Sequence, residues 1–353
     1  GVSLQTGTIP SKALREAAFL VSRFAAKGMR ANINRQLSTH NQYLTEAMRS
    51  KDMVIKQQES VMLHRLMQLG IDIIPGEASF IDEHSLRVNS STDSSDTLQA
   101  DFIILATGSR PRRPAEIPFD KQRVLDSSSI LKLRRLPERM VIVGGGVIAC
   151  EFATMFAPLG VAVTIIDSHQ QLLAYLDTDI AGHLAEHMHD MDITLHMNTR
   201  ISQIETQQDQ VIVSAGDHVI ETDTVLYALG RQPNYDGLDI DKAGLVADDN
   251  GWIRINDNFQ TAHEHIYIIG DLAGSPALAS TAMHQGQAVI RHAFSGKTSA
   301  SMPLLPMAIY TIPELSYIGE TERQLTERQA DYVTGRAHYN ETARGQIIGD
   351  HHG

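Results

Sequence analysis

Apolar residues in the first hundred positions change from helical spacing to short continuous runs. Ala, Leu, Met and Gln recur at helical spacing over residues 12–27 and about 35–69, which predicts two helices. Short apolar runs then predict three strands, at 71–82, 85–88 and 101–109. The polar stretch 90–96 predicts the tip of a hairpin.

Strands and helices alternate through the middle of the chain. The pattern predicts strands at 140–143, 161–166, 192–196, 209–214 and 223–228, and helices at 147–158 and 177–189. A further apolar strand is expected within 265–274, followed by a helix from about 278 to 295. Because parallel strands are joined by crossover helices, this order predicts an α/β fold with a doubly wound parallel sheet.

Charge and cysteine content narrow the class of protein. The chain has 353 residues, and its 30 Lys and Arg against 42 Asp and Glu give a net charge of −12. Such a balance argues against nucleic acid or an anionic membrane as the main partner. The single cysteine, Cys150, excludes an internal disulfide and suits a reducing cytoplasm. The apolar stretch 140–166 is interrupted by glycines and Pro158, so we expect no transmembrane helix.

The segment VIVGGGVIACEFA (141–153) carries the motif G-x-G-x-x-G/A between a predicted strand and a predicted helix. Gly144 permits the tight turn, Gly146 permits close approach of a pyrophosphate, and Ala149 keeps the helix close to the strand. Asp167 ends the next strand, where an acid can accept hydrogen bonds from the adenosine ribose. Together these features predict a dinucleotide site.

Asp167 also bears on which dinucleotide binds. A carboxylate at this place favours the free 2′-hydroxyl of NAD(H) and repels a 2′-phosphate. The next residues, 168–171, include no arginine to bind that phosphate. His169 among them could help only when protonated.

Several segments taken together resemble the flavoprotein disulfide reductase superfamily. They are TGTIPSK, ATGS, GGGVIACE, ALGRQPN, IYIIGDLAG and ALASTAMHQG, in this order. The resemblance covers nearly the whole chain. It implies two Rossmann-like three-layer domains, as in glutathione reductase, that bind FAD and NAD(P), plus the start of an α+β dimerisation domain. The implied divisions are an FAD-binding domain at 1–136 and 257–302, an NAD(P)-binding domain at 137–256, and a dimerisation domain at 303–353.

The resemblance also implies which residues contact the cofactor and the substrate. It places Lys12 beside the reactive nitrogen of the flavin and Glu151 near the nicotinamide, and makes these two the catalytic residues. A lone charge in the apolar helix at 147–158 needs a partner, which independently favours a Lys12–Glu151 pair. The FAD-binding residues that the resemblance implies are Lys12, Ala78, Thr107, Gly108, Ser109, Asp271, Ala277, Leu278, Ala279 and Ser280. The NAD(P)-binding residues are Gly144, Gly145, Gly146, Val147, Ile148, Ala149, Glu151, Asp167 and Gly230.

The opening segment GVSLQTGTIPSK lacks the two cysteines of the disulfide branch, because Ser3 and Thr8 stand at their positions. A hydroxyl cannot form a disulfide, so the nucleotide site becomes the expected route for electrons both in and out. The segments TGTIPSKALREA and IYTIPELSYIG resemble the branch that transfers hydride between pyridine nucleotides. We therefore expect ping-pong hydride transfer between NAD(H) and NADP(H) through FAD, in a cytoplasmic homodimer.

Three other functions stay open. They are an NADH-preferring diaphorase, a dihydrolipoamide dehydrogenase-like relative that has lost its cysteines, and a non-catalytic NAD(H)-binding redox sensor. No second glycine fingerprint precedes residue 1 and the last domain is short, so we expect the chain to be a fragment. His183 and His187 share a helix face, but without a distant third ligand we expect no metal site.

Overall fold

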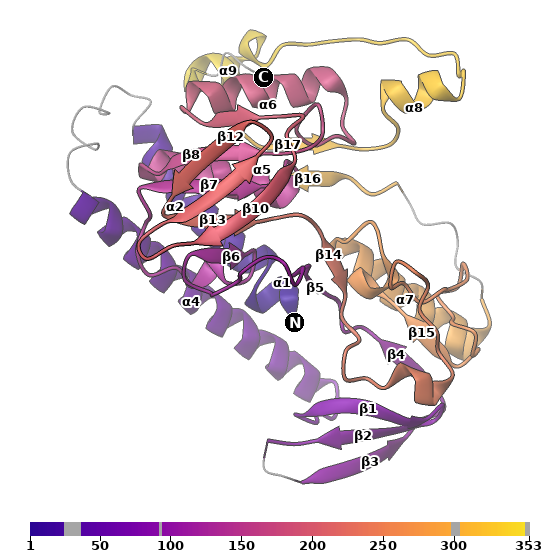
Figure 1. The fold of residues 1–353 in the computed structure, drawn as a ribbon. Coiled ribbons are helices and arrows are strands. Elements are labelled where there is room, and N and C mark those ends of the chain that lie inside the picture. Colours follow the sequence, from indigo (N-terminus) through magenta and orange to yellow (C-terminus); the bar gives the residue numbers. More distant parts are fainter. Residues whose placement is uncertain (25–36, 92–93, 298–303, 350–353) are drawn as a thin grey trace. The chain divides into compact units, whose positions relative to one another are not determined.

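The computed structural model describes residues 1–24, 37–91, 94–297 and 304–349 (Figure 1). The chain divides into two compact units. The first unit comprises residues 1–8, 55–112 and 230–305, and the second comprises residues 9–54, 113–229 and 306–353. The domain boundaries expected from the resemblance stay a prediction.

A five-stranded parallel sheet forms the centre of the second unit, as the alternating pattern predicts. Its strands in spatial order are β6 (Val124–Asp126), β13 (Thr224–Tyr227), β7 (Arg139–Val143), β8 (Ala162–Ile166) and β9 (Thr194–His196). All neighbouring strands in this sheet pair in parallel. The crossovers that such pairing requires are α5 (Val147–Phe156) and α6 (Thr178–Asp190), close to the predicted helices.

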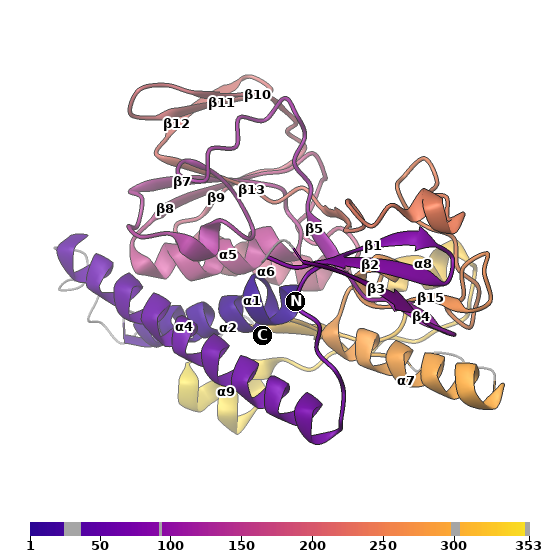
Figure 2. The same ribbon diagram turned by 90° about the horizontal axis from the view of Figure 1, so that it is seen from below.

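Alternation of side chains along β7 separates the two cores of this unit. Met140 and Ile142 pack with α5, whereas Val141 and Val143 pack on the other face against β11 (Val211–Ala215). Figure 2 shows α5 and α6 on one side of the sheet and β10 to β12 on the other. The parallel sheet is therefore the middle of three layers.

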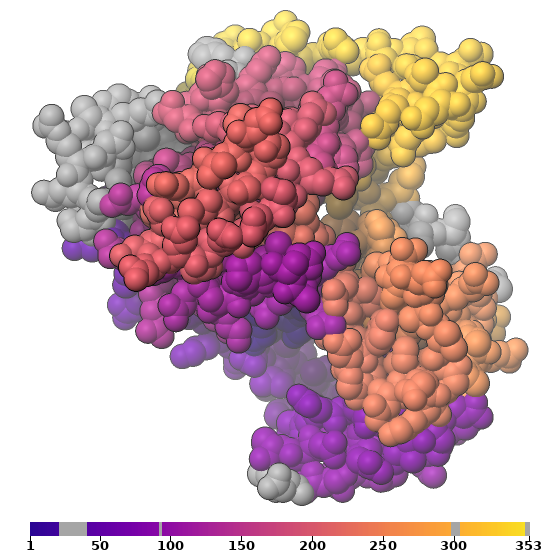
Figure 3. Space-filling view, in the orientation of Figure 1, coloured from indigo at the N-terminus to yellow at the C-terminus, as the bar shows by residue number. Residues whose placement is uncertain are grey.

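The third layer corrects part of the sequence prediction. The expected strand at 209–214 is β11, and it lies in a separate antiparallel sheet with β10 (Ile201–Thr206) and β12 (His218–Thr222). Only a few residues separate these strands, and so short a connection can join antiparallel neighbours but cannot cross over to a parallel one. In the space-filling view these strands form the red surface of the second unit that faces the viewer (Figure 3).

The remaining elements of the second unit come from both ends of the chain. Leu14 and Ala18 of α2 (Thr8–Phe24) and Leu44 of α4 (Leu37–Gln68) join the core on the α5 side of the sheet. The described C-terminal elements are β16 (Met307–Ile309), β17 (Leu315–Tyr317), α8 (Glu322–Glu327) and α9 (Ala343–Ile348). The predicted end of the first N-terminal helix, at 25–27, lies outside the described residues. So does the predicted start of the second helix, at 35–36.

The first unit is built from small sheets and a few helices. Its strands are β1 (Glu77–Asp82), β2 (Ser85–Asn89) and β3 (Ser95–Gln99) in an antiparallel sheet, β4 (Ile103–Leu105) parallel to β15 (Ile266–Ile268), and β5 (Ser109–Pro111) antiparallel to β14 (Arg231–Pro233). The helices are α1 (Val2–Gln5) and α7 (Ala279–Ser295), and the second half of α4 also belongs here. Phe80, Leu105 and Ile268 belong to the core that joins these sheets.

One predicted strand is shorter than expected. The run 71–82 predicts a single strand, but β1 begins at Glu77, and Ile71, Ile73 and Ile74 are exposed. A strand needs a neighbour for its backbone hydrogen bonds, and none pairs with 71–76 within the described part of the chain. Among the helices of the described residues, none is long and apolar enough to cross a membrane.

Candidate functional site

The glycine turn between β7 and α5 has a backbone that only glycine adopts easily. Gly144 has a φ of +114°, and its N–H donates to the carbonyl of Ile166 on β8 at 2.8 Å. A Cβ at this position would lie 3.0 Å from the carbonyl oxygen of Ala228. The turn can therefore pass closely between two strand ends, which is the role the motif predicts for its first glycine.

The start of α5 supplies unpaired donors for an anion. Gly146 caps the helix without a side chain, and no atom lies within 4 Å of the place where a Cβ would stand. The first-turn amides of an α-helix have no partner within the helix and carry partial positive charge. Ala149, completely buried, packs in the core beneath them. This open, donor-rich cradle fits the pyrophosphate of a dinucleotide.

Asp167 lies at the end of β8, where the motif expects the ribose-binding acid, but other donors already bind its carboxylate. The group is 5% exposed. Oδ2 accepts a hydrogen bond from the N–H of Gly145, while Oδ1 accepts from both the backbone N–H and the ring Nδ1 of His169 at 2.6 Å each. A carboxylate has about four acceptor positions, so three are taken and about one is left for a ribose hydroxyl.

Lys12 and Glu151 form a close ion pair inside the second unit. The ammonium of Lys12 lies 2.7 and 2.6 Å from the two carboxylate oxygens of Glu151, although 139 residues separate them. The side chain of Glu151 is 7% exposed and that of Lys12 27%. Glu151 lies just beyond the first turn of α5, and Lys12 lies on α2, so the pair is held by the same helix that begins at the glycine turn.

A third residue, Tyr310, completes this group and was not found from the sequence. Its backbone N–H donates to Oε1 of Glu151 at 2.9 Å, and its ring lies 4.7 Å from the ammonium of Lys12. An ammonium over an aromatic face is stabilised electrostatically. The segment IYTIPELSYIG that contains Tyr310 contributes to the resemblance, but spacing along the chain gives no sign of which partner its ring contacts.

Three contacts hold the Tyr310 segment in place, and the two hydrogen bonds among them are buried. The hydroxyl of Thr154 on α5 accepts from the N–H of Ile312 at 3.1 Å. Arg15 on α2 donates to the carbonyl of Thr311 at 3.2 Å and pairs with Glu314 at 2.6 Å. The two helices that carry Lys12 and Glu151 therefore also fix the segment that covers them.

In the first unit, Asp271 is bound to the ATGS turn through Ser109. The hydroxyl of Ser109 donates to Oδ2 of Asp271 at 2.6 Å. Arg231 holds Ser109 in turn, because Nε donates to its hydroxyl at 2.8 Å and Nη2 to its carbonyl at 2.7 Å. The other oxygen of Asp271 makes no hydrogen bond within the described residues, so it can accept one from a ligand hydroxyl. Arg231 is a second residue that the sequence reasoning missed, one place beyond the Gly230 it selected.

Several of the other predicted flavin-binding positions of this unit are exposed or have open space beside them. Gly108 has a φ of +76° with no atom near its missing Cβ. Leu278 caps α7 without a side-chain hydrogen bond, and Ala277, Ala279 and Ser280 are exposed. Ala78 is half-buried on β1, an edge strand on whose outer side the N–H of Phe80 donates to the carbonyl of Leu238 at 2.8 Å. The helix start and the free carboxylate oxygen are a donor and acceptor set that fits FAD.

The predicted site residues are thus divided between the units. The dinucleotide turn, Asp167, Lys12 and Glu151 belong to the second unit, whereas the remaining flavin-binding positions and Gly230 belong to the first. Within the second unit the structure brings Lys12 to Glu151 and Gly145 to Asp167. Within the first unit it brings Ser109 to Asp271.

A comparison of the sequence with protein families gives one match to most of the chain. Residues 1–286 match the family described as pyridine nucleotide-disulphide oxidoreductase. The chain belongs to this family. Members are flavin-dependent oxidoreductases, so the cofactor is FAD and the substrates are pyridine nucleotides, as the resemblance predicts.

Relatives and solved structures agree with this assignment. A soluble pyridine nucleotide transhydrogenase of Mycobacterium tuberculosis is 39% identical over 361 aligned positions, which cover 100% of this chain and 75% of the relative. One of Yersinia enterocolitica is 38% identical, covering 97% and 73%. The flavoprotein disulfide reductase RclA from Escherichia coli has a TM-score of 0.86 at 27% identity, covering 100% and 77%. LpdA from Mycobacterium tuberculosis, 24% identical over 100% and 77%, shares the fold with a TM-score of 0.88. The predicted family and fold class are confirmed.

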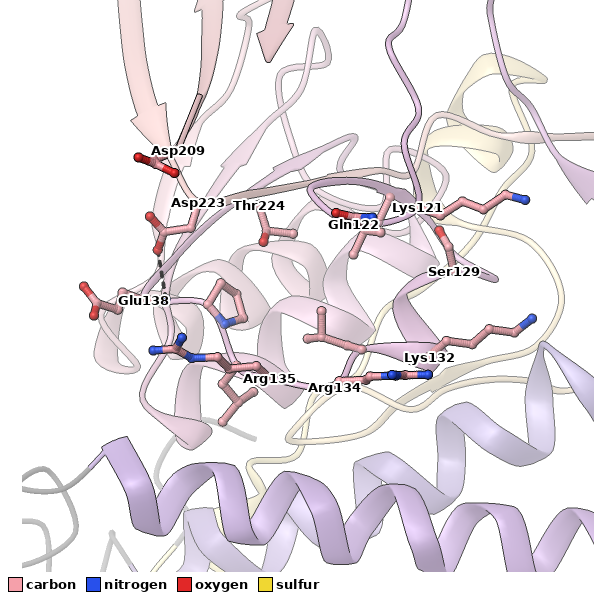
Figure 4. Close-up of a pocket in the computed structure, with 14 residues that line it drawn as sticks. Lys121, Gln122, Ser129, Lys132, Arg134, Arg135, Glu138, Asp209, Asp223 and Thr224 are labelled. Atoms are coloured by element: carbon pink, nitrogen blue, oxygen red, sulfur yellow. Dashed lines mark hydrogen bonds between the residues drawn. The ribbon is translucent and has the colours of Figure 1, made fainter. Parts of the chain in front are cut away.

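The second unit also has a large cavity, whose lining residues Figure 4 shows. Its volume is about 680 Å³, and Glu138, Asp223 and Thr224 line it at the amino ends of β7 and β13. Its basic lining residues are Lys121, Lys132, Arg134 and Arg135. Gly144 follows the carboxyl end of β7, so the cavity and the nucleotide turn lie at opposite edges of the sheet.

Two further chemistry-bearing groups are accounted for by their surroundings. Cys150 is buried in α5, and burial raises the pKa of its thiol, with smaller contributions from the carboxylates of Asp167 and Glu151. The thiol therefore stays protonated and unreactive at neutral pH. His183 pairs with Glu186 at 3.6 Å, and within the described ranges no group of three or more potential ligands could hold a metal ion.

Proposed function

We propose that this chain transfers hydride between NAD(H) and NADP(H) with bound FAD and without a redox disulfide. FAD, when bound, supplies the two-electron acceptor and donor, so that two nucleotides use one site in turn in ping-pong order. The observation that carries the proposal is the Lys12–Glu151 pair on α5, the helix whose start also offers the pyrophosphate cradle. Transhydrogenases 38–39% identical over at least 97% of the chain support it.

The residues of the chain divide the work between binding and charge. The open amides at Gly146 and the helix start bind the pyrophosphate of the nucleotide. About 7.5 Å further along the helix axis, by the 1.5 Å rise per residue, Glu151 binds Nζ of Lys12 through both carboxylate oxygens. Tyr310 covers that ammonium and limits its access to water. We propose that this fixed positive charge stabilises negative charge as it develops at the reacting end of the nucleotide site.

We infer from Ser3 and Thr8 that the protein has no redox disulfide. These residues stand where the disulfide branch has its cysteines, and Cys150 is buried in the second unit. Electrons then have no thiol route to a second substrate.

Hydride transfer from NADPH to an NAD⁺ analogue tests the proposal. We expect the full-length, FAD-loaded protein to transfer hydride with parallel double-reciprocal plots, and to be insensitive to a thiol-alkylating reagent. Sequential kinetics would refute the ping-pong order. Loss of activity on alkylation would refute the disulfide-free route.

A second function, an NADH-preferring diaphorase, is favoured by one observation. Asp167 is an acid at the ribose position, and 168–171 hold no arginine. If the protein oxidises NADH with a dye or quinone but gives no transfer from NADPH, this second function replaces the first.

We also propose a cytoplasmic homodimer. The single cysteine suits a reducing compartment, the curated relatives are named soluble, and the resemblance implies dimerisation through the region after residue 303. Light scattering on the full-length protein tests the oligomeric state, and a monomeric mass would refute the dimer.

A further inference from the structure

His169 stands directly beside the acid at the predicted ribose position. Its Nδ1 lies 2.6 Å from Oδ1 of Asp167, and its own side chain is 64% exposed. We propose that His169 is the residue that binds the 2′-phosphate of NADP(H) and so lets one site use both nucleotides. This inference rests on the proposed function, since a diaphorase restricted to NADH would not need it.

The geometry fixes which ring nitrogen is free. A carboxylate oxygen can only accept, so Nδ1 is the donor to Asp167. In the neutral ring Nε2 is then an acceptor, which suits a 2′-hydroxyl but repels a phosphate. Protonation places a second N–H on Nε2 and a positive charge on the ring, which suits a phosphate dianion.

The hydrogen bonds that the Asp167 carboxylate already accepts explain why His169, and not the acid, binds the 2′-phosphate. Three hydrogen bonds from Gly145 and His169 leave about one acceptor position for ribose. The hydrogen bond to the ring also partly offsets the negative charge that would repel a phosphate. The acid therefore serves the hydroxyl of NAD(H), while the exposed ring serves the phosphate of NADP(H).

The other charged and titratable groups near His169 come from the neighbouring strand and turn. The backbone carbonyl of His169 accepts from the N–H of Asn198, two residues before the exposed Arg200. On β9, burial and the nearby ring of His218 lower the pKa of His196, so His196 is neutral at pH 7. A difference in phosphate binding between the unmodified protein and a His169 variant at the same pH therefore reports on His169.

Equilibrium binding of NAD⁺ and NADP⁺ tests this role without turnover. The ratio of their dissociation constants is measured at pH 6 and pH 8 for the full-length protein, His169→Gln and His169→Arg. We expect His169→Gln to weaken NADP⁺ relative to NAD⁺ about fivefold at pH 6 and little at pH 8. His169→Arg should strengthen NADP⁺ relative to NAD⁺ about tenfold at pH 8. The phosphate's own titration near pH 6 is common to all proteins and cancels in these comparisons.

His183→Gln is the matched control, because it removes an exposed histidine that pairs with a carboxylate on α6, away from the turn. We expect its ratio to equal that of the unmodified protein at both pH values. Equal ratios for the unmodified protein and His169→Gln at pH 6 would overturn the proposal. So would a His169→Arg variant with no gain for NADP⁺. Because only binding is measured, the result is independent of whether hydride transfer to NADP⁺ occurs.

Discussion

Replacement of Glu151 by glutamine tests whether the Lys12–Glu151 pair is a coupled unit. Glutamine keeps an acceptor for the N–H of Tyr310 but removes the negative charge that binds the ammonium of Lys12. Breaking one partner of a buried pair costs about 3–5 kcal/mol. Because the Lys12 side chain is 27% exposed, water can replace part of the lost interaction, and we expect a smaller cost, about 2 kcal/mol.

The assay is a double-mutant cycle with Glu151→Gln, Lys12→Met and the double variant. Urea unfolding of the full-length protein, followed by circular dichroism, gives each free energy of unfolding. We expect a coupling energy of about 1.5 kcal/mol for the pair. The exposed pair of Arg328 and Glu320, at 2.8 Å with side chains 57% and 47% exposed, is the control, and its cycle should give under about 0.5 kcal/mol.

Activity is measured on the same variants. If the ammonium acts on the reacting end of the nucleotide site, a loss of about 2 kcal/mol in transition-state stabilisation lowers kcat/KM about thirtyfold for Glu151→Gln. A coupling energy as small as that of the control pair, together with unchanged kcat/KM, would refute the reasoning from burial and distance.

Three further predictions concern the glycine turn, the flavin-binding turn and a histidine pair. Gly144→Ala places a Cβ 3.0 Å from a carbonyl oxygen at a φ of +114°, so we expect the free energy of unfolding to fall by about 2 kcal/mol, measured by urea titration. Arg231→Met removes both hydrogen bonds to Ser109, and we expect FAD to bind about tenfold more weakly in a fluorescence titration, whereas unchanged affinity would contradict the link to the ATGS turn. Burial, and to a smaller extent the charge of His218, lowers the pKa of His196 from 6.5. The neutral ring of His196 therefore contributes stability above pH 6.5, and this contribution is lost as the pH falls through the folded-state pKa. The urea midpoint should therefore drop between pH 7.5 and pH 5, and His196→Gln should flatten that drop.

The pattern of the sequence determined the local elements and the glycine turn. Strand β7, helix α5 and strand β8 follow the predicted bounds within two residues, because apolar periodicity and turn glycines act through nearby backbone geometry. The same holds for the positive φ of Gly144, which a motif can predict since it concerns a few adjacent residues. Family membership also followed from the order of the segments along the chain.

Only the tertiary structure decided which distant groups meet. The contact between Lys12 and Glu151 depends on how α2 packs against α5. The position of the Tyr310 ring over Lys12 depends on how the 306–317 segment packs against α5. The antiparallel sheet of β10 to β12 likewise arose from short connections that the strand pattern alone did not distinguish from parallel crossovers. Asp167 shows the difference most clearly. The spacing of the motif predicted its place at a strand end. The hydrogen bonds that Gly145 and His169 donate to its carboxylate depend on side-chain orientation, which the apolar pattern does not predict.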